Sequence, residues 1–386
     1  MSRKAVLDTE SAVRRRYERA AKEKAAALCC PVRYDPKYLD VIPAEILERD
    51  YGCGDPTPHV RPGDTVLDLG SGGGKLAYVA AQMVGPKGGV IGVDFSPAML
   101  ALARKHQSRV AERVGYDNVN FRRGRIQDLA LSLDEVDAYL EANPIRSSDD
   151  LRKLEEFQDR LRRAAPLVAD GSVDVIISNC VLNLVKESER ENLFREMYRV
   201  LKRGGRVAIS DVVSDEDVPE AMKGDPELWS GCIAGAPRED RFLEAFEQAG
   251  FYGIAFHQYE RRPWQTVRGI EFRSVTVTAR KGKEGPCRER YQAVIYKGPW
   301  KKVEDDDGHI LYRGKRMAVC DKTYHLLTAE PYAEEIIPVP PLKELPLEKA
   351  KPFACGKRSL RPPWETKGKS YRKTTRADAA CGPGCC

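Results

Sequence analysis

The 386-residue sequence lacks the long apolar runs of a membrane or secreted protein. No such run reaches the roughly 18 residues of a membrane-spanning helix. The first 20 residues, MSRKAVLDTESAVRRRYERA, have no apolar core of a secretory signal. Hydrophobic residues still make up 42% of the chain, enough for a packed interior. These features predict a cytoplasmic globular protein without a membrane partner.

Several motifs of common catalytic sites are also missing. No Cys-x-x-C pair occurs, and zinc sites are usually built from such pairs. The absence of a G-x-x-x-x-G-K-[ST] loop disfavours a P-loop kinase or ATPase. Histidine is scarce and scattered, and we interpret its five occurrences as structural: His59, His106, His257, His309 and His325.

The chain has little net charge for its length. Its 64 basic residues nearly balance 58 acidic ones, which leaves +6. The excess lies late, in KRSLRPPWETKGKSYRKTTR. Because a solvated basic tail explains this stretch more simply than a nucleic-acid surface, we expect no nucleic-acid partner.

Cysteine, by contrast, is abundant. The odd number of cysteines and the missing signal sequence argue against the disulfide framework of a secreted protein. The cysteines therefore need another explanation, at least in part. They are Cys29, Cys30, Cys53, Cys180, Cys232, Cys287, Cys320, Cys355, Cys381, Cys385 and Cys386.

From Thr65 onward, short apolar segments alternate with helix-forming ones. The run VDVIIS is almost continuously apolar, which is typical of a parallel strand buried on both faces. This rhythm predicts an α/β fold with a doubly wound sheet. Strands are expected at 65–70, 89–95, 119–124, 173–180, 205–213, 253–260 and 273–280, and helices at 75–85, 97–115, 189–201 and 239–250.

The sequence divides into four segments. Residues 1–60 are expected to form helices and loops, with a helix over 11–28, and residues 61–285 the α/β core. Charged, helix-forming residues interrupt the core at 133–166, which predicts a helical insertion. Residues 286–345 predict a small β-rich C-terminal module. Residues 346–386 are basic, contain cysteine and are expected to be disordered.

A glycine-rich turn indicates a nucleoside site in the core. Gly70, Gly72 and Gly74 follow the first strand, where backbone must approach a ligand closely. Asp94 ends the second strand and can accept the hydroxyls of a ribose. Asp68 either orients the turn or faces the amino-acid end of the ligand. Without a phosphate-binding motif, an adenosine site of this kind points to S-adenosylmethionine.

The remaining expected cofactor contacts come from the same sheet edge. The segment GRIQDL at 124–129 ends the third strand with residues suited to an adenine edge, and Asp128 is the favoured contact. Class I methyltransferases resemble residues 60–280 in strand order and motif position, so the fold is expected to be their Rossmann-like one.

Three cysteines fall where segments of such a fold converge over the cofactor. Cys53 precedes the first strand, Cys180 follows the fourth, and Cys232 follows the fifth and a short helix. Ligands bind beyond the carboxyl ends of the strands in open α/β sheets. A spatial cluster of the three thiols is therefore expected.

At these residues the chain resembles the arsenite S-adenosylmethionine methyltransferases. The shared stretches are CC at 29–30, YGCG at 51–54, LDLGSGGG at 67–74, SNCVLNL at 178–184, EMYRVLKRGG at 196–205 and LWSGCIAGA at 228–236. The resemblance runs from about Cys29 to Pro340. The insertion is longer than the usual link in that family.

The resemblance implies roles for individual residues. Cys53, Cys180 and Cys232 would bind As(III), and Cys30, or alternatively Cys29, would be an additional redox cysteine that pairs with Cys53. The residues expected to bind the cofactor are Tyr51, Asp68, Gly70, Ser71, Gly72, Asp94, Met99, Ile126, Gln127, Asp128 and Asn179.

The implied chemistry suits these residue types. Soft thiolates select soft, thiophilic centres, and the lone pair of As(III) can attack a sulfonium methyl without a general base. Methyl transfer formally gives As(V), and a cysteine pair can return it to As(III) by forming a disulfide. The implied function is the detoxifying methylation of arsenite and then methylarsenite by a monomer, reset by glutathione or a thioredoxin-like thiol.

Two other functions are consistent with parts of the pattern. A methyltransferase for an organic small molecule would use the same cofactor site but would not need three cysteines. A thiolate metal binder or sensor would not bind S-adenosylmethionine. Outside the cluster, Cys287 and Cys320 are interpreted as small buried residues, and Cys355 lies in the tail. Cys381, Cys385 and Cys386 are either an accessory soft-metal trap or a terminus without function.

Overall fold

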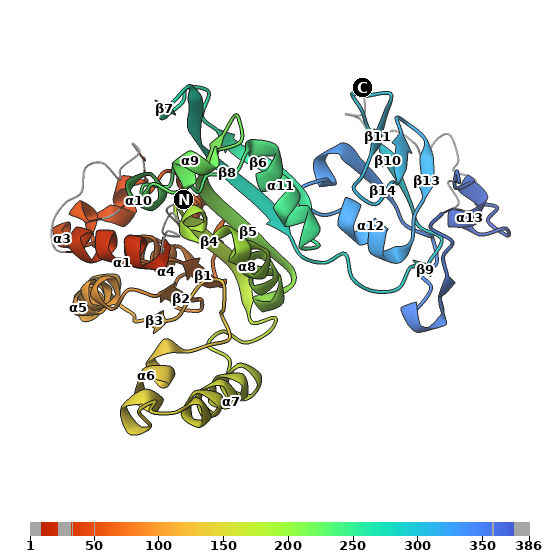
Figure 1. Cartoon of the computed structure of the whole chain (residues 1–386). Helices are drawn as coiled ribbons and strands as arrows, with labels where there is room; N and C mark the ends of the chain where they lie inside the picture. The colour runs from red at the N-terminus through yellow and green to blue at the C-terminus, as the bar shows by residue number, and fades with distance from the viewer. Residues whose placement is uncertain (1–8, 22–31, 33, 50, 357–358, 374–386) are drawn as a thin grey trace. The chain divides into compact units, whose positions relative to one another are not determined.

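The chain forms two compact units in a computed structural model (Figure 1). The structure describes residues 9–21, 32, 34–49, 51–356 and 359–373. The first unit spans Met1–Gly282 and the second Lys283–Cys386. In the described part of the chain, no helix is long and apolar enough to cross a membrane.

A mixed sheet forms the centre of the first unit. Its main order is β3-β2-β1-β4-β5-β8-β6, with β7 paired to β8. Strands β1 to β5 are parallel, whereas β8 is antiparallel to both β5 and β6. The strands are β1 Thr65–Leu69, β2 Gly89–Asp94, β3 Val119–Arg123, β4 Val173–Asn179, β5 Leu201–Ser214, β6 Tyr252–Tyr259, β7 Gln265–Val267 and β8 Ile270–Arg280.

Helices cover both faces of this sheet. Side chains alternate between the faces along a strand, so Ile177 of β4 packs with α4 and α5 while Ile176 packs with α8 and α11. This arrangement explains why VDVIIS is apolar at nearly every position and confirms the doubly wound α/β fold. The helices are α4 Lys75–Val84, α5 Pro97–Val114, α8 Glu187–Val200 and α11 Glu239–Gln248.

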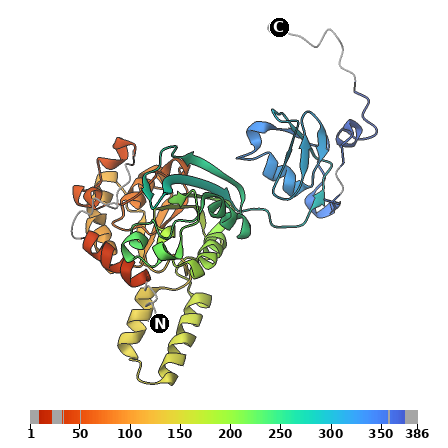
Figure 2. The same cartoon turned by 45° about the horizontal axis from the view of Figure 1, so that its top comes forward.

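The expected helical insertion is a pair of helices between β3 and β4. Helix α6 spans Leu133–Ala142 and α7 spans Ser148–Ala164, each capped at its N-terminus by a serine. Tyr139 and Phe157 stack between them with ring centroids 4.3 Å apart. Figure 2 shows the two helices side by side, projecting beyond the sheet.

Short helices and the N-terminal helix complete the first unit. The helix expected over 11–28 begins earlier, at Thr9, and α1 ends at Ala20; residues 22–28 lie outside the described part. The other elements are α2 Pro36–Leu39, α3 Ala44–Glu48, η2 Thr57–His59, η3 Leu182–Leu184, α9 Glu220–Lys223 and α10 Pro226–Ser230.

The second unit is β-rich, as expected for a C-terminal module. Its described strands form one three-stranded and two two-stranded sheets. The strands are β9 Arg288–Glu289, β10 Ala293–Tyr296, β11 Lys302–Glu304, β12 Ile310–Tyr312, β13 Arg316–Ala318, β14 Ile336–Val339 and β15 Lys351–Pro352. The helices are α12 Asp321–Leu327, η4 Ala333–Glu335, η5 Leu347–Lys349 and α13 Pro363–Lys367.

The expectation of disorder from residue 346 onward is wrong for the described part of that segment. Strand β15 pairs with β9, and Leu360 forms a β-bridge with Met317. Arg361 is buried and binds the carboxylate of Glu289 at 2.8 Å. Basic composition misled the prediction, because this arginine is paired inside the unit rather than solvated.

Candidate active site

The glycine-rich turn after β1 borders a cavity of about 290 Å³ at the carboxyl ends of the strands. The N–H groups of Gly70 and Ser71 donate to the carbonyl of Val93, which ties the turn to β2. Gly70 has a φ of 70°, and a Cβ there would overlap the side chain of Val181. Only glycine therefore allows the turn to pass this closely beneath the cavity.

Asp94 is held rigidly at the edge of this cavity. Its carboxylate accepts hydrogen bonds from the N–H of Gly72 at 2.9 Å and of Ser96 at 2.8 Å. Burial raises the pKa of Asp94, while the backbone hydrogen bonds oppose this shift. A fixed carboxylate beside a glycine turn suits the ribose of an adenosine ligand.

Most of the expected cofactor residues line the same cavity. They are Tyr51, Asp68, Gly70, Ser71, Gly72, Asp94, Met99, Ile126, Gln127 and Asn179. The apolar side chains of Leu76, Met99 and Ile126 line the cavity together with the acidic and backbone groups. This mixture of apolar wall, carboxylate and glycine cradle fits S-adenosylmethionine.

Asp128 is the exception among these residues. It is not part of the cavity lining, and its carboxylate binds the guanidinium of Arg162 on α7 at 3.0 Å. The sequence expectation that Asp128 contacts the adenine is thus not supported. The insertion supplies the cation that pairs with this carboxylate, a partner that the local motif GRIQDL could not reveal.

Helix α1 contributes residues that the sequence analysis did not assign to the site. Val13 and Tyr17 line the cavity, and Glu10 binds Arg125 at 2.9 Å across it. Tyr17 also packs edge-on against Tyr51, with ring centroids 6.2 Å apart. The spacing of Val13 and Tyr17 places them on one helix face. This spacing is visible in the sequence, but it does not indicate a ligand site.

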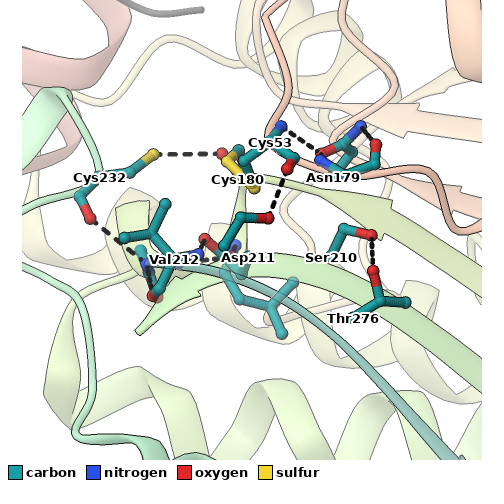
Figure 3. The surroundings of a disulfide bond; sticks show 12 residues. Cys53, Asn179, Cys180, Ser210, Asp211, Val212, Cys232 and Thr276 are labelled. Atoms are coloured by element: carbon teal, nitrogen blue, oxygen red, sulfur yellow. Dashed lines mark hydrogen bonds between the residues drawn. A yellow bond between two sulfur atoms is a disulfide. The ribbon is translucent and has the colours of Figure 1, made fainter. Parts of the chain in front are cut away.

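The loop before β1 is joined to the end of β4 by a disulfide. Cys53 and Cys180 form the bond, and their Cα atoms are 5.9 Å apart (Figure 3). The pair implied by the family resemblance, Cys53 with Cys30, includes a residue outside the described part of the chain. The fold accounts for the observed bond, because the loop that carries Cys53 meets the carboxyl end of β4, directly before Cys180.

Asn179 connects these two segments. Its Oδ1 accepts hydrogen bonds from the N–H of Cys53 at 2.8 Å and of Gly54 at 3.2 Å. Its Nδ2 donates to the Gly54 carbonyl at 2.6 Å and to the Tyr34 hydroxyl at 2.8 Å. A side chain expected to bind the cofactor therefore also positions a cysteine.

Replacing Asn179 by alanine is expected to destabilise the protein by about 3 kcal/mol, because partly buried backbone groups would lose their partners. Urea denaturation of the reduced protein measures this effect. The same change at Asn120, exposed on β3, should alter the free energy of unfolding by less than about 0.5 kcal/mol. Equal effects of the two substitutions would contradict the positioning role.

Cys232 lies beside the disulfide in the same buried cluster. Its Sγ donates to the carbonyl oxygen of Cys180 at 3.3 Å, and all three cysteines belong to one hydrophobic cluster (Figure 3). Cys180 and Cys232 both have left-handed backbone conformations, with φ of 57° and 63°. Such conformations are costly for residues other than glycine and concentrate at functional sites.

Asp211 of β5 is a further site residue that the sequence analysis missed. One of its carboxylate oxygens and the sulfur atoms of Cys53 and Cys180 all lie within 4.8 Å of one another. The carboxylate accepts from the N–H groups of Leu182 and Asn183 and so holds the turn that follows Cys180. Burial raises the pKa of Asp211 to about 6, against the effect of its backbone hydrogen bonds.

Comparisons with known proteins identify relatives of both units. A family model described as a methyltransferase domain matches residues 61–250, and one described as a domain of unknown function matches residues 283–371. An arsenite methyltransferase of Aquipseudomonas alcaligenes is 33% identical over 317 residues, which cover 78% of this chain and 81% of that relative. The arsenite methyltransferase of Mus musculus is 28% identical over 92% of this chain and 87% of its own length.

A solved structure extends the similarity to the fold. The crystal structure of an arsenic(III) S-adenosylmethionine methyltransferase from Chlamydomonas reinhardtii matches with a TM-score of 0.55 and 28% identity. The match covers 84% of this chain and 99% of that one. The chain therefore belongs to the family of S-adenosylmethionine-dependent arsenite methyltransferases.

Proposed function

We propose that this protein methylates As(III) bound to Cys53, Cys180 and Cys232. The observation that carries the proposal is the position of Cys180, which lines the cofactor cavity and shares a cluster with the other two cysteines. Arsenite and then methylarsenite are the proposed substrates, and detoxification is the proposed outcome. The related proteins named as arsenite methyltransferases support this choice of substrate.

The three cysteines would bind and orient the arsenic atom. Thiols replace the hydroxyl groups of arsenite with loss of water, which leaves one lone pair on arsenic. When bound, S-adenosylmethionine supplies an electrophilic methyl group. The backbone conformation of Cys180, fixed by Asp211 and the turn, would aim that lone pair at the cavity. Alignment of this kind lowers the barrier without a general base.

The disulfide suggests how arsenic returns to the trivalent state. Methylation converts As(III) to As(V) while all three sulfur atoms remain bound. Cys53 and Cys180 would then leave arsenic as a disulfide, so that two thiolates lose two electrons and As(V) gains them. Cys232 would keep the methylated As(III), and water or a thiol would take the vacant coordination position with release of one proton. In this scheme the structure corresponds to the oxidised state of the enzyme.

Resetting the enzyme would require an external thiol. Two equivalents of a small thiol, or one protein dithiol, reduce the disulfide by exchange. A cavity of about 510 Å³ is lined by Cys53, Gly54, Gln258, Glu260 and Arg262. It offers a route to the Cys53 side of the bond that differs from the cofactor cavity. The proposed reductant is glutathione or a thioredoxin-like protein.

The proposed function predicts methylation that depends on prior reduction. Purified protein with the Cys53–Cys180 bond intact should give no methylated arsenic from arsenite and S-adenosylmethionine, because two ligands are blocked. Adding a thiol should start turnover, measured by chromatographic separation of arsenic species. Protein that binds S-adenosylmethionine but forms no methylated arsenic after full reduction would contradict the proposal and favour an organic substrate.

A further inference from the structure

Three cysteines that the proposed reaction does not use meet in the second unit. Cys287 precedes β9, Cys320 precedes α12 and Cys355 follows β15. Their sulfur atoms all lie within 4.8 Å of one another, and none of the three forms a disulfide. Cys320 is buried, as expected from the sequence, whereas Cys287 is only half-buried, and no context in the sequence would place Cys355 beside them.

Specific contacts of the unit hold the three segments together. Arg288 of β9 pairs with Pro352 of β15, and the N–H of Phe353 donates to the Cys287 carbonyl at 2.9 Å. These bonds bring the segments of Cys287 and Cys355 side by side. Arg290 binds Asp321 at 2.8 Å, which fixes the start of α12 against β9. The cluster is thus a product of the fold and not of one flexible loop.

The cluster combines a buried anchor with accessible thiols. Cys320 is 1% exposed, and its sulfur accepts a hydrogen bond from the N–H of Thr323 at 3.4 Å. Cys287 and Cys355 are half-buried, so part of each of these residues is exposed to solvent. Burial, followed by the neighbouring thiols, raises the pKa of Cys355 to about 12.

We propose that Cys287, Cys320 and Cys355 form a second binding site for As(III), separate from the active site. As(III) takes three sulfur ligands, whereas structural zinc usually takes four ligands. Among the described residues, no fourth Cys, His, Asp or Glu completes the set. Binding is a condensation in which As(OH)₃ and three thiols give one As(SR)₃ group and three water molecules. The oxidation state does not change, and no proton is released.

The choice of arsenic among thiophilic ions rests on the proposed function, but the test does not need activity. Full-length protein with Cys53, Cys180 and Cys232 replaced by serine would be reduced and equilibrated with arsenite. Bound arsenic is then counted by equilibrium dialysis and elemental analysis. Because this background lacks the proposed active-site thiols, its result is independent of whether those thiols bind or methylate arsenic.

In that background, Cys355→Ser and Cys287→Ser should each lower the affinity for one equivalent of arsenite by about 100-fold. This factor is the lower end of the affinity that is gained when several binding groups are linked in one site. Cys385→Ser with Cys386→Ser is the matched control and should leave that equivalent in place. X-ray absorption should show three As–S bonds. If the tail control removes the equivalent and the other variants do not, the proposal is wrong.

Folding and metal content complete the test. Cys320 is buried, so its substitution could unfold the unit; Cys287 and Cys355 avoid this difficulty because they are half-buried. Arsenite should also raise the unfolding temperature of the second unit, since a ligand bound only by the native state stabilises it. Stoichiometric zinc that requires all three cysteines and excludes arsenite would overturn the assignment.

Discussion

Replacing Cys180 by serine is expected to lower methyl transfer to arsenite by about 10³-fold or more, as for a residue that acts within a catalytic unit. A serine hydroxyl is a hard ligand and binds As(III) weakly compared with a thiolate. The variant also cannot form the disulfide with Cys53 that the proposed cycle requires. Both arsenic binding and reduction should therefore fail together.

The decisive measurement separates arsenic chemistry from cofactor binding. Cys180→Ser should bind S-adenosylmethionine within about threefold of the wild type, as measured by calorimetry, because Asp94 and the glycine turn are unchanged. Val110→Ala, which removes packing at a buried residue of α5 outside the cavity, serves as the packing control and should retain methylation. A Cys180→Ser enzyme that methylates arsenite at the wild-type rate would eliminate the thiolate mechanism.

Much of the fold follows from local patterns in the sequence. The run VDVIIS predicts a strand buried on both faces, and the structure packs Ile176 and Ile177 into opposite cores. The glycine turn predicts a close approach of backbone to a ligand, and Gly70 leaves no room for a side chain. Both patterns are visible in residues adjacent in sequence, although the side chain that excludes a Cβ at Gly70 belongs to the distant Val181.

The parts of the site that sequence reasoning missed depend on distant partners. Asp128 stands where an adenine contact is expected, yet Arg162 from the insertion binds it. Asp211 lies within an ordinary buried strand and becomes notable only because the sulfur atoms of Cys53 and Cys180 are close. Motif spacing carries no information about such pairs.

The two groups of cysteines differ in how far their proximity could be predicted from the sequence. The three in the first unit could be expected together because each falls at the carboxyl edge of one sheet. Those in the second unit fall before or after short elements with no common motif, and pairing of β9 with β15 brings two of them together. Absence of a Cys-x-x-C pair therefore disfavours only one kind of thiolate site.

Asp94→Ala is expected to weaken S-adenosylmethionine binding by about 100-fold. If the carboxylate accepts both ribose hydroxyls, its loss removes two charge-assisted hydrogen bonds worth about 1.5 kcal/mol each, or about 3 kcal/mol. The free energy of unfolding should fall by less than this, because the N–H groups of Gly72 and Ser96 lose their acceptor but the desolvation cost of a buried carboxylate is removed with it. Calorimetric titration and thermal unfolding of the same protein measure the two effects.

Asp128→Ala is the matched control, since Asp94 ends β2, Asp128 lies in the loop that follows β3, and only Asp94 lines the cavity. Its loss breaks the ion pair with Arg162, which lies partly exposed to solvent, and should leave cofactor affinity within about twofold. The opposite ranking, with Asp128→Ala weakening binding more than Asp94→Ala, would show that the insertion moves and frees Asp128 for the adenine. The pair of variants thus decides whether the strand-end carboxylate or the GRIQDL motif recognises the nucleoside.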